Sequence, residues 1–330
     1  MNPPLTISVV IPAYNAALTL NECLAALAAS RLKPSEIIVM DDASTDSTRE
    51  IAQQAQVRVI TLDTNHGAAR AKNRGAAAAT GDILFFTDSD ILVKPDSLTC
   101  LVECFADPGL AGVVGVLDAE IPFQDFASQF KNLWMNFTYA RLDRRKNVGL
   151  FYTSAAAIRR QVFLALGGFD ENYQGASIVE DSEFGQRLWQ KDERVIVEPG
   201  LVVTHLKAYT LGDVLQTDFL RARALMLLRL RNWGQAFYTS VPIFYQLSVP
   251  LLFFLIFALL FALFSPLAVW SAIAFALLFY LANLPLLKYL ADRRGFGFAL
   301  RAAFFLPFDV LVVGLGMLRA VFDWLRGARY

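Results

Sequence analysis

The sequence predicts an α/β domain built on a mostly parallel sheet, followed by an α-helical transmembrane region. In the first part of the chain, short apolar runs alternate with segments of helical apolar spacing, which is the pattern of βαβ units. In the second part, no Asp, Glu, Lys, Arg or His occurs from Trp233 to Leu287, which is long enough for two bilayer crossings at about 20 residues each. The chain is 55% hydrophobic with a mean hydropathy of +0.42, too apolar for an ordinary soluble enzyme.

The strands and helices of the first part can be assigned in chain order. The run Ile7–Ile11 is apolar and rich in β-branched residues, as in a parallel strand that is buried on both faces. The other expected strands are Ile37–Met40, Val57–Leu62 and Ile83–Thr87, and the expected helices are Leu18–Ala29, Asp46–Gln54 and Ala68–Ala79. From about Gly112 to Pro199 the pattern is mixed and predicts short strands with a helix near Asp125–Ala140.

The second part divides into an amphipathic helix and apolar segments. Residues 213–232 hold four arginines among Leu and Phe, a mixture that suits a helix lying in the membrane interface. Val241–Phe264 and Leu267–Leu287 are candidate membrane spans. A third segment, Phe298–Phe322, contains Asp309 and either spans the bilayer or re-enters and returns. We therefore expect three regions, at residues 1–212, 213–237 and 238–330.

Charge is unevenly distributed, although the formal net charge is zero. Residues 213–330 hold 11 Lys and Arg against 5 Asp and Glu, which suits a segment that meets anionic lipid. The basic residues of Lys288–Arg301 favour a cytosolic loop, whereas a third full span would place Arg326 and Arg329 outside. The N-terminal residues MNPPLTISVVIP lack the features of a signal peptide. We expect a multi-pass protein of the cell membrane with its α/β domain on the cytosolic face.

Three cysteines, Cys23, Cys100 and Cys104, are too few for a disulfide framework. Cys100 and Cys104 are four residues apart and would share one face of a helix. No further His or Cys lies near them in the sequence, so we interpret them as small buried residues rather than as a metal site.

Polar residues follow three of the expected strands at the point where each strand ends. The first strand runs into Pro12-Ala13-Tyr14-Asn15, the second into Asp41-Asp42, and the fourth into Asp88-Ser89-Asp90. Ligands of parallel α/β sheets bind at the carboxyl ends of strands, so these residues are candidates for binding. Alternate residues of an extended chain point to the same side, so Asp88 and Asp90 can both face one Mg²⁺ or Mn²⁺.

These segments resemble family 2 of the inverting glycosyltransferases, which has the Rossmann-like GT-A fold. The resemblance covers roughly residues 6–210 and depends on the order of several motifs, each unspecific alone. Besides the three strand ends, they are the stretch Asn65–Gly75, Gly167-Gly168-Phe169-Asp170-Glu171, and Glu180-Asp181 followed by Arg187-Leu188. The Gln-x-x-Arg-Trp signature of processive polymerases is absent, so the resemblance implies transfer of one sugar.

The resemblance also implies roles for particular residues. Tyr14 and Asp42 match positions that hold the nucleotide base, and Pro12 belongs to the expected nucleotide-sugar-binding residues. Asp88 and Asp90 match the motif that binds ribose, diphosphate and the divalent cation. Lys72 stands where the family often has arginine, and is a candidate ligand of the donor phosphates. His205 stands where some relatives place a late metal or phosphate ligand, with a structural histidine as the alternative. The matching catalytic base is Asp181.

The expected function is therefore a metal-dependent glycosyltransferase of the hexosyltransferase type. Its expected partners are a nucleotide-sugar donor, with uridine favoured as the base, the lipid bilayer, and a membrane lipid or polyprenyl-linked acceptor; nucleic acid is not expected. Asp181 would act as general base on the acceptor hydroxyl, and a cation on Asp90 would neutralise the leaving diphosphate. The alternative is a non-catalytic sugar-nucleotide-binding or scaffold subunit of a glycan export assembly.

Overall fold

The chain forms two compact units, which are described separately. The computed structural model describes residues 5–173 and 179–330. The first unit comprises Met1–Pro122, Tyr139–Lys207 and Gly234–Tyr238, and the second comprises Phe123–Thr138, Ala208–Trp233 and Thr239–Tyr330. Each unit is thus assembled from three stretches of sequence.

The first unit begins with four parallel strands, as the sequence predicts. They are β1 (Ile7–Ala13), β2 (Glu36–Asp41), β3 (Arg58–Thr61) and β4 (Ile83–Phe86), in the spatial order β3-β2-β1-β4. The connecting helices are α1 (Leu20–Ala29), α2 (Thr48–Gln54) and α3 (Ala68–Ala78). All four carboxyl ends therefore meet at one edge of the sheet, and the predicted βαβ pattern is confirmed.

The sheet continues beyond β4 with strands of mixed direction. The added strands are β7 (Ala156–Arg159), β6 (Gly112–Leu117), β8 (Val195–His205) and β5 (Ile91–Val93), which complete the order β3-β2-β1-β4-β7-β6-β8-β5. β7 is antiparallel to β4 and β6, and β5 is antiparallel to β8, whereas β6 and β8 are parallel. The associated helices are α4 (Ser97–Phe105), the short 3-10 helix η1 (Thr153–Ala155), α6 (Arg160–Ala165) and α7 (Glu180–Gln190).

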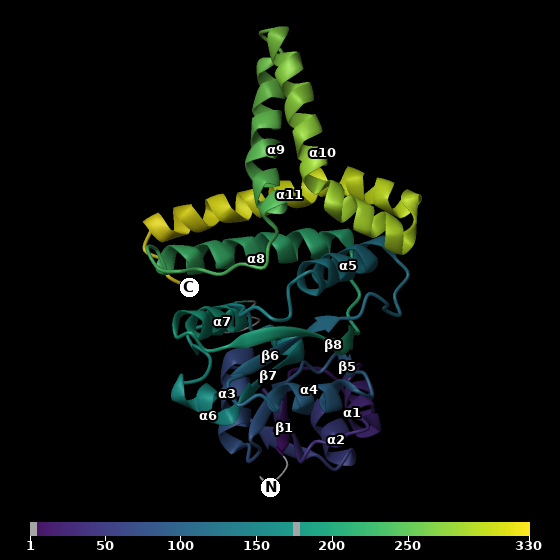
Figure 1. The fold of residues 1–330 in the computed structure, drawn as a ribbon, viewed down its shortest axis with the longest axis vertical. Coiled ribbons are helices and arrows are strands. Elements are labelled where there is room, and N and C mark those ends of the chain that lie inside the picture. The colour runs from purple at the N-terminus through teal and green to yellow at the C-terminus, as the bar shows by residue number, and fades with distance from the viewer. Residues whose placement is uncertain (1–4, 174–178) are drawn as a thin grey trace. The chain divides into compact units, whose positions relative to one another are not determined.

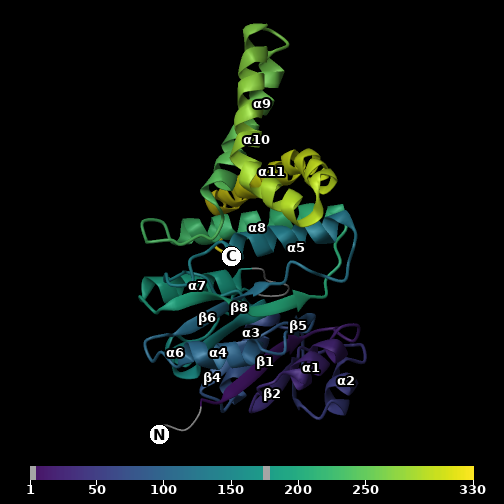
Figure 2. The same cartoon turned by 45° about the vertical axis from the view of Figure 1, so that its right-hand side comes forward.

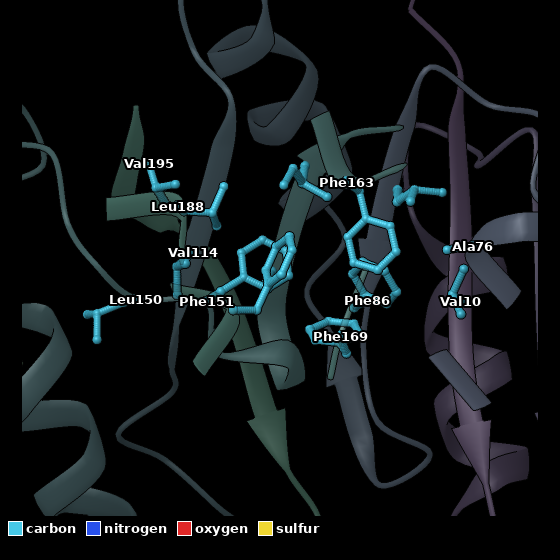
Figure 3. Close-up of a cluster of buried hydrophobic side chains, with 14 of the residues drawn as sticks. Val10, Ala76, Phe86, Val114, Leu150, Phe151, Phe163, Phe169, Leu188 and Val195 are labelled. Carbon is cyan, nitrogen blue, oxygen red and sulfur yellow. The ribbon is translucent and has the colours of Figure 1, made fainter. Parts of the chain in front are cut away.

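A cluster of buried aromatic rings packs against β4 and joins it to the later part of the unit (Figure 3). The ring of Phe86 lies 6.0 Å from that of Phe151, 5.2 Å from Phe163 and 5.3 Å from Phe169. Such aromatic contacts contribute about 0.5–1.5 kcal/mol each beyond area burial. They fix the end of β4, from which the Asp88-Ser89-Asp90 segment emerges.

The second unit is helical in the residues that the structure describes. It holds most of α5 (Phe126–Ala140), followed by α8 (Leu211–Arg231), α9 (Ile243–Phe261), α10 (Leu267–Arg294) and α11 (Phe296–Leu325). Helices α9 and α10 lie side by side as an antiparallel hairpin, and α11 lies along α8 (Figures 1 and 2). Three helices, α9, α10 and α11, are long and apolar enough to cross a membrane.

The third apolar segment is one continuous helix that contains Pro307. Its buried Asp309 accepts a hydrogen bond from the hydroxyl of Tyr245 on α9 at 2.7 Å. Near the end of α11, Asp323 forms ion pairs with Arg223 of α8 at 2.6 Å and with Arg319 of its own helix at 2.9 Å. Both carboxylates of this apolar helix therefore have polar partners within the unit, as expected for charges in such a segment.

Candidate active site

Two tight loops at the carboxyl ends of β1 and β2 bind each other. Asn15 and Ala43 both adopt positive φ angles, 51° and 61°. The side-chain oxygen of Asn15 accepts the N–H of Thr45 at 2.8 Å, and the N–H of Asn15 donates to the hydroxyl of Ser44 at 3.0 Å. A left-handed alanine costs about 1–3 kcal/mol and is retained only where its surroundings hold it, commonly at ligand sites. Tyr14, directly before Asn15 in the loop after β1, is 50% exposed, while Pro12 is half-buried.

The adjacent carboxylates Asp41 and Asp42 have different partners. Asp41 is fully buried, forms an ion pair with Arg49 at 3.0 Å and accepts the N–H of Ser44. Asp42, 3% exposed, accepts the backbone N–H groups of His66 and Gly67 at 2.9 and 2.7 Å, and so holds the loop that opens α3. Two carboxylate oxygens can accept about four hydrogen bonds, so Asp42 retains capacity for a ligand.

The Asp88-Ser89-Asp90 segment connects β4 to β5. Pairing of β5 with β8 sets Ile91 opposite His205, and the imidazole Nε2 of His205 lies 3.1 Å from Asp90. Burial raises the pKa of Asp90, but the hydrogen bond and charge of His205 and the charge of Lys207 outweigh it, so the net pKa lies below its usual value. The two predicted metal ligands are thus adjacent, and offer an oxygen and a nitrogen that suit a divalent cation.

Lys72 lies inside the unit with its ammonium paired. It is 2% exposed, forms an ion pair with Glu180 at 2.9 Å and donates to the hydroxyl of Thr153. Burial lowers the pKa of Lys72, but the charges of Glu180, Asp88 and Asp181 raise it further, so the net pKa lies above its usual value. The sequence motivated a phosphate-binding role for Lys72, whereas its partner in this structure is Glu180.

Asp181 lies in the first turn of α7, beside Glu180 and Glu183. The positive end of a helix stabilises negative charge in this turn. Lys72 is within electrostatic range of both Asp181 and Asp88. The negative charges of the predicted general base and of Asp88 therefore both act on the ammonium of Lys72, whose direct partner is Glu180.

Sequence reasoning missed three residues that organise this part of the site. The hydroxyl of Ser154 donates to Asp88 at 2.5 Å, and its neighbour Thr153 accepts a hydrogen bond from Lys72. The helix η1 therefore contacts both Asp88 and the ammonium that pairs with Glu180. Glu180 pairs with Lys72 through one oxygen, and its other oxygen, Oε2, is buried without a hydrogen-bond partner among the described residues. Two features of the sequence could have indicated these residues: the adjacent hydroxyl side chains of Thr153 and Ser154, and the position of Glu180 directly before Asp181.

Cys23 is buried beneath the Asp88-Ser89-Asp90 segment. Its thiol lies 3.5 Å from the backbone oxygen of Asp88. Burial, and then the negative charges of Asp90 and Asp88, raise the pKa of Cys23 to about 12. The thiol is therefore protonated at neutral pH and is not a nucleophile, because thiolates carry that reactivity.

Comparison with known proteins identifies the family. A sequence model described as glycosyl transferase family 2 matches residues 8–167. An O-antigen chain rhamnosyltransferase of Salmonella typhimurium is 30% identical over 230 residues, which cover 64% of this chain and 70% of that protein. The chain belongs to glycosyltransferase family 2. A second O-antigen chain rhamnosyltransferase, of Salmonella anatum, is 29% identical to this family 2 enzyme over 64% of its chain and 70% of that relative.

A solved structure confirms the GT-A fold of this family 2 glycosyltransferase. A mannosyltransferase from Pyrobaculum calidifontis, in complex with GDP-Man and Mn²⁺, superposes with a TM-score of 0.59 at 19% identity. The match covers 96% of this chain and 88% of the mannosyltransferase. At that identity the likeness concerns the fold.

The buried Lys72–Glu180 pair generates a prediction about stability. Lys72→Met leaves a buried carboxylate without its cation, and we expect a loss of about 3–5 kcal/mol in the free energy of unfolding. Replacing both residues, as Lys72→Met with Glu180→Met, should restore most of that loss, because an apolar pair of similar volume needs no counter-charge. The measurement is the melting temperature of the purified transferase in detergent.

The matched control is Lys191→Met, which removes an exposed lysine at the end of α7 and should leave the melting temperature almost unchanged. Equal melting temperatures for Lys72→Met and Lys191→Met would contradict a stabilising ion pair.

Proposed function

We propose that this glycosyltransferase moves one sugar, with inversion, from a nucleotide-diphosphate sugar to a lipid or polyprenyl-linked acceptor. The observation that carries the proposal is the pairing of His205 with Asp90, next to Asp88, which η1 links through Ser154 and Thr153 to the Lys72–Glu180 pair before Asp181. Asp88 and Asp90 suit the binding of a cation and a diphosphate, and Asp181 suits proton transfer. The relation to O-antigen chain rhamnosyltransferases supports a cell-envelope acceptor.

The donor binds, in this proposal, across the ends of β1, β2 and β4. The half-exposed ring of Tyr14 offers a face for the base, with uridine favoured, beside Pro12 and Asp42. The hydrogen bonds between the loops of Asn15 and Ala43 support this assignment, because they limit the motion of both loops before a donor binds. Asp88 then faces the ribose and diphosphate.

Asp90 and His205 are the residues that would hold a divalent cation, Mg²⁺ or Mn²⁺, beside the donor diphosphate. Such a cation, when bound, neutralises the charge that builds up on the leaving diphosphate. The lowered pKa of Asp90 keeps its carboxylate ionised at neutral pH, as a ligand requires. Ser154 fixes the orientation of Asp88 by its hydrogen bond, so both carboxylates are preset.

Asp181 acts as the general base. It accepts the proton of the acceptor hydroxyl while the oxygen attacks the anomeric carbon, and the bond electrons leave with the diphosphate. The helix terminus and nearby Lys72 favour an ionised Asp181 before the reaction. Lys72 and Glu180 support the base by fixing the first turn of α7. A single displacement needs no covalent nucleophile, in agreement with the protonated thiol of Cys23.

The membrane part of the proposal concerns the α9–α10 hairpin. We infer that α9 and α10 cross the bilayer and that α8 and α11 lie at the cytosolic interface. The four arginines and two aspartates of α8 exclude it from the hydrocarbon core, and the Arg223–Asp323 ion pair ties the end of α11 to it. An even number of crossings returns the C-terminal arginines, Arg326 and Arg329, to the cytosol, in agreement with the positive-inside rule.

The first prediction tests the reaction and the base. Wild-type enzyme in lipid nanodiscs, given radiolabelled nucleotide sugars and a bacterial lipid extract, should release nucleotide diphosphate and transfer label to the organic phase. Asp181→Asn should lose transfer by about 100-fold or more, the lower end of the range for general acid–base catalysis, yet bind donor with wild-type affinity. Collapse of donor affinity with turnover retained would make Asp181 a binding residue. Label confined to water-soluble products would exclude the lipid acceptor.

The second prediction tests the cation. Asp90→Asn should abolish the stimulation of turnover by Mn²⁺ or Mg²⁺, because an amide is a poorer ligand than a carboxylate. Asp96→Asn serves as the control, since it removes a nearby carboxylate that is exposed and only pairs with Arg31 at the surface. If Asp90→Asn stays within a few-fold of wild type at saturating metal, Asp90 is not a ligand.

The third prediction tests the membrane topology. In a background with the three native cysteines replaced by serine, Phe264→Cys in the α9–α10 turn should react with a membrane-impermeant maleimide in intact cells. Ala328→Cys, which follows α11, should react only after the membrane is permeabilised. Labelling of Ala328→Cys in intact cells would mean that α11 crosses the bilayer.

A further inference from the structure

Two thiols and a carboxylate meet on the first unit, where α4 packs against β8. The ligand atoms of Cys100, Cys104 and Glu198 all lie within 4.8 Å of one another. Within residues 5–173 and 179–330, no other group of three His, Cys, Asp or Glu side chains comes this close. None of the three residues takes part in the proposed transfer reaction.

The two thiols are brought together by helix geometry. Cys100 and Cys104 are four residues apart on α4, so their side chains stand one above the other on the same face. Both are half-buried, which leaves an ion a route from solvent. A spacing of two to four residues between paired ligands on a short segment recurs in structural zinc sites.

The carboxylate is delivered by an irregularity in β8. In the ladder with β6, Val114 pairs with Val197 but Val116 pairs with Val202, so residues 198–201 bulge out of the strand. Bulges of this kind re-aim a side chain and are common next to functional sites. Here the bulge turns Glu198 toward α4, with one oxygen 3.9 Å from the thiol of Cys104.

The bulge also fits closely over the thiols. The other oxygen of Glu198 accepts the N–H of Gly200 at 2.8 Å, which fixes the carboxylate in place. A Cβ atom at Gly200 would lie 2.9 Å from the sulfur of Cys100 and 3.1 Å from Glu198. Glycine is therefore the residue that allows this strand to approach the sulfur of Cys100.

We propose that Cys100, Cys104 and Glu198 form a zinc site, with water as the fourth ligand. Sulfur ligands select Zn²⁺ over Mg²⁺, Mn²⁺ and Ca²⁺, which prefer oxygen. With Zn–S bonds of about 2.3 Å, tetrahedral geometry places the two sulfur atoms roughly 3.8 Å apart. The ligand atoms of this cluster lie within 4.8 Å of one another, so only a small adjustment is needed. Binding displaces the two thiol protons, and the two thiolates with one carboxylate then offset the charge of the ion.

Such a site has a structural consequence. A zinc ion would join α4 to β8, the strand that ends at His205 and pairs with β5. It would be chemically distinct from the cation at Asp90 and His205, because that site has no sulfur ligand. The inference is independent of the proposed function.

The test uses the full chain, purified in detergent, reduced and stripped of metal, with Co²⁺ as the probe. Thiolate-bound Co²⁺ gives a near-ultraviolet charge-transfer band that oxygen and nitrogen ligands do not give. We expect this band in the wild type and in Cys23→Ser, a fall to half its intensity or less in Cys100→Ser and in Cys104→Ser, and its displacement by one equivalent of Zn²⁺. No band in the wild type, or a band that both serine variants retain at full intensity, overturns the proposal.

Glu198→Gln keeps the test decisive if a serine variant fails to fold, because it conserves size and the hydrogen bond to Gly200. We expect it to weaken Zn²⁺ affinity by about tenfold or more, the scale already seen for loss of an outer-shell partner. Unchanged affinity in a competition with a chelator of known strength would exclude Glu198 as a ligand.

Discussion

The buried ion pair between Lys72 and Glu180 is the interaction on which the arrangement of the candidate site depends. It connects α3, from the parallel half of the sheet, to the first turn of α7. Both partners are almost fully buried, so neither charge is stable there without the other. Because Thr153 binds the same ammonium and Ser154 binds Asp88, the pair also sets the position of η1 between the two carboxylate groups.

The mixed sheet explains how one site receives residues from distant parts of the sequence. Four parallel strands bring the loops of Tyr14, Asp42 and Asp88 to one edge. The antiparallel pairing of β5 with β8 then sets His205 against Asp90, although 115 positions separate them in the sequence. In the proposed function, the loops after the parallel strands bind the nucleotide, and the antiparallel pairing of β5 with β8 at the far edge places His205 beside Asp90.

The sequence predicted the first half of the fold well, because β1 to β4 are continuous apolar runs separated by helical segments. It did not resolve β5 to β8, whose direction and pairing are set by contacts between segments rather than by local pattern. For the same reason the sequence suggests only a phosphate-binding role for Lys72. Its ion-pair partner, Glu180, lies 108 positions later, and no pattern near Lys72 predicts that contact. The sequence near Cys100 and Cys104 does not indicate the third ligand, because Glu198 lies 94 positions after Cys104 and reaches the thiols only through the bulge in β8.

The return of the chain at Gly234–Tyr238 has a consequence for biosynthesis. Tyr238 exchanges two hydrogen bonds with Gln186 of α7, at 2.9 and 3.0 Å, and its ring lies 5.3 Å from that of Trp189. These contacts belong to the first unit, yet α8 is translated before them. A nascent chain therefore acquires the last support of the helix that carries Asp181 only after the ribosome has passed Tyr238. The packing of α7 is therefore completed only after α8 has been synthesised, and a chain that ends before Gly234 lacks these contacts.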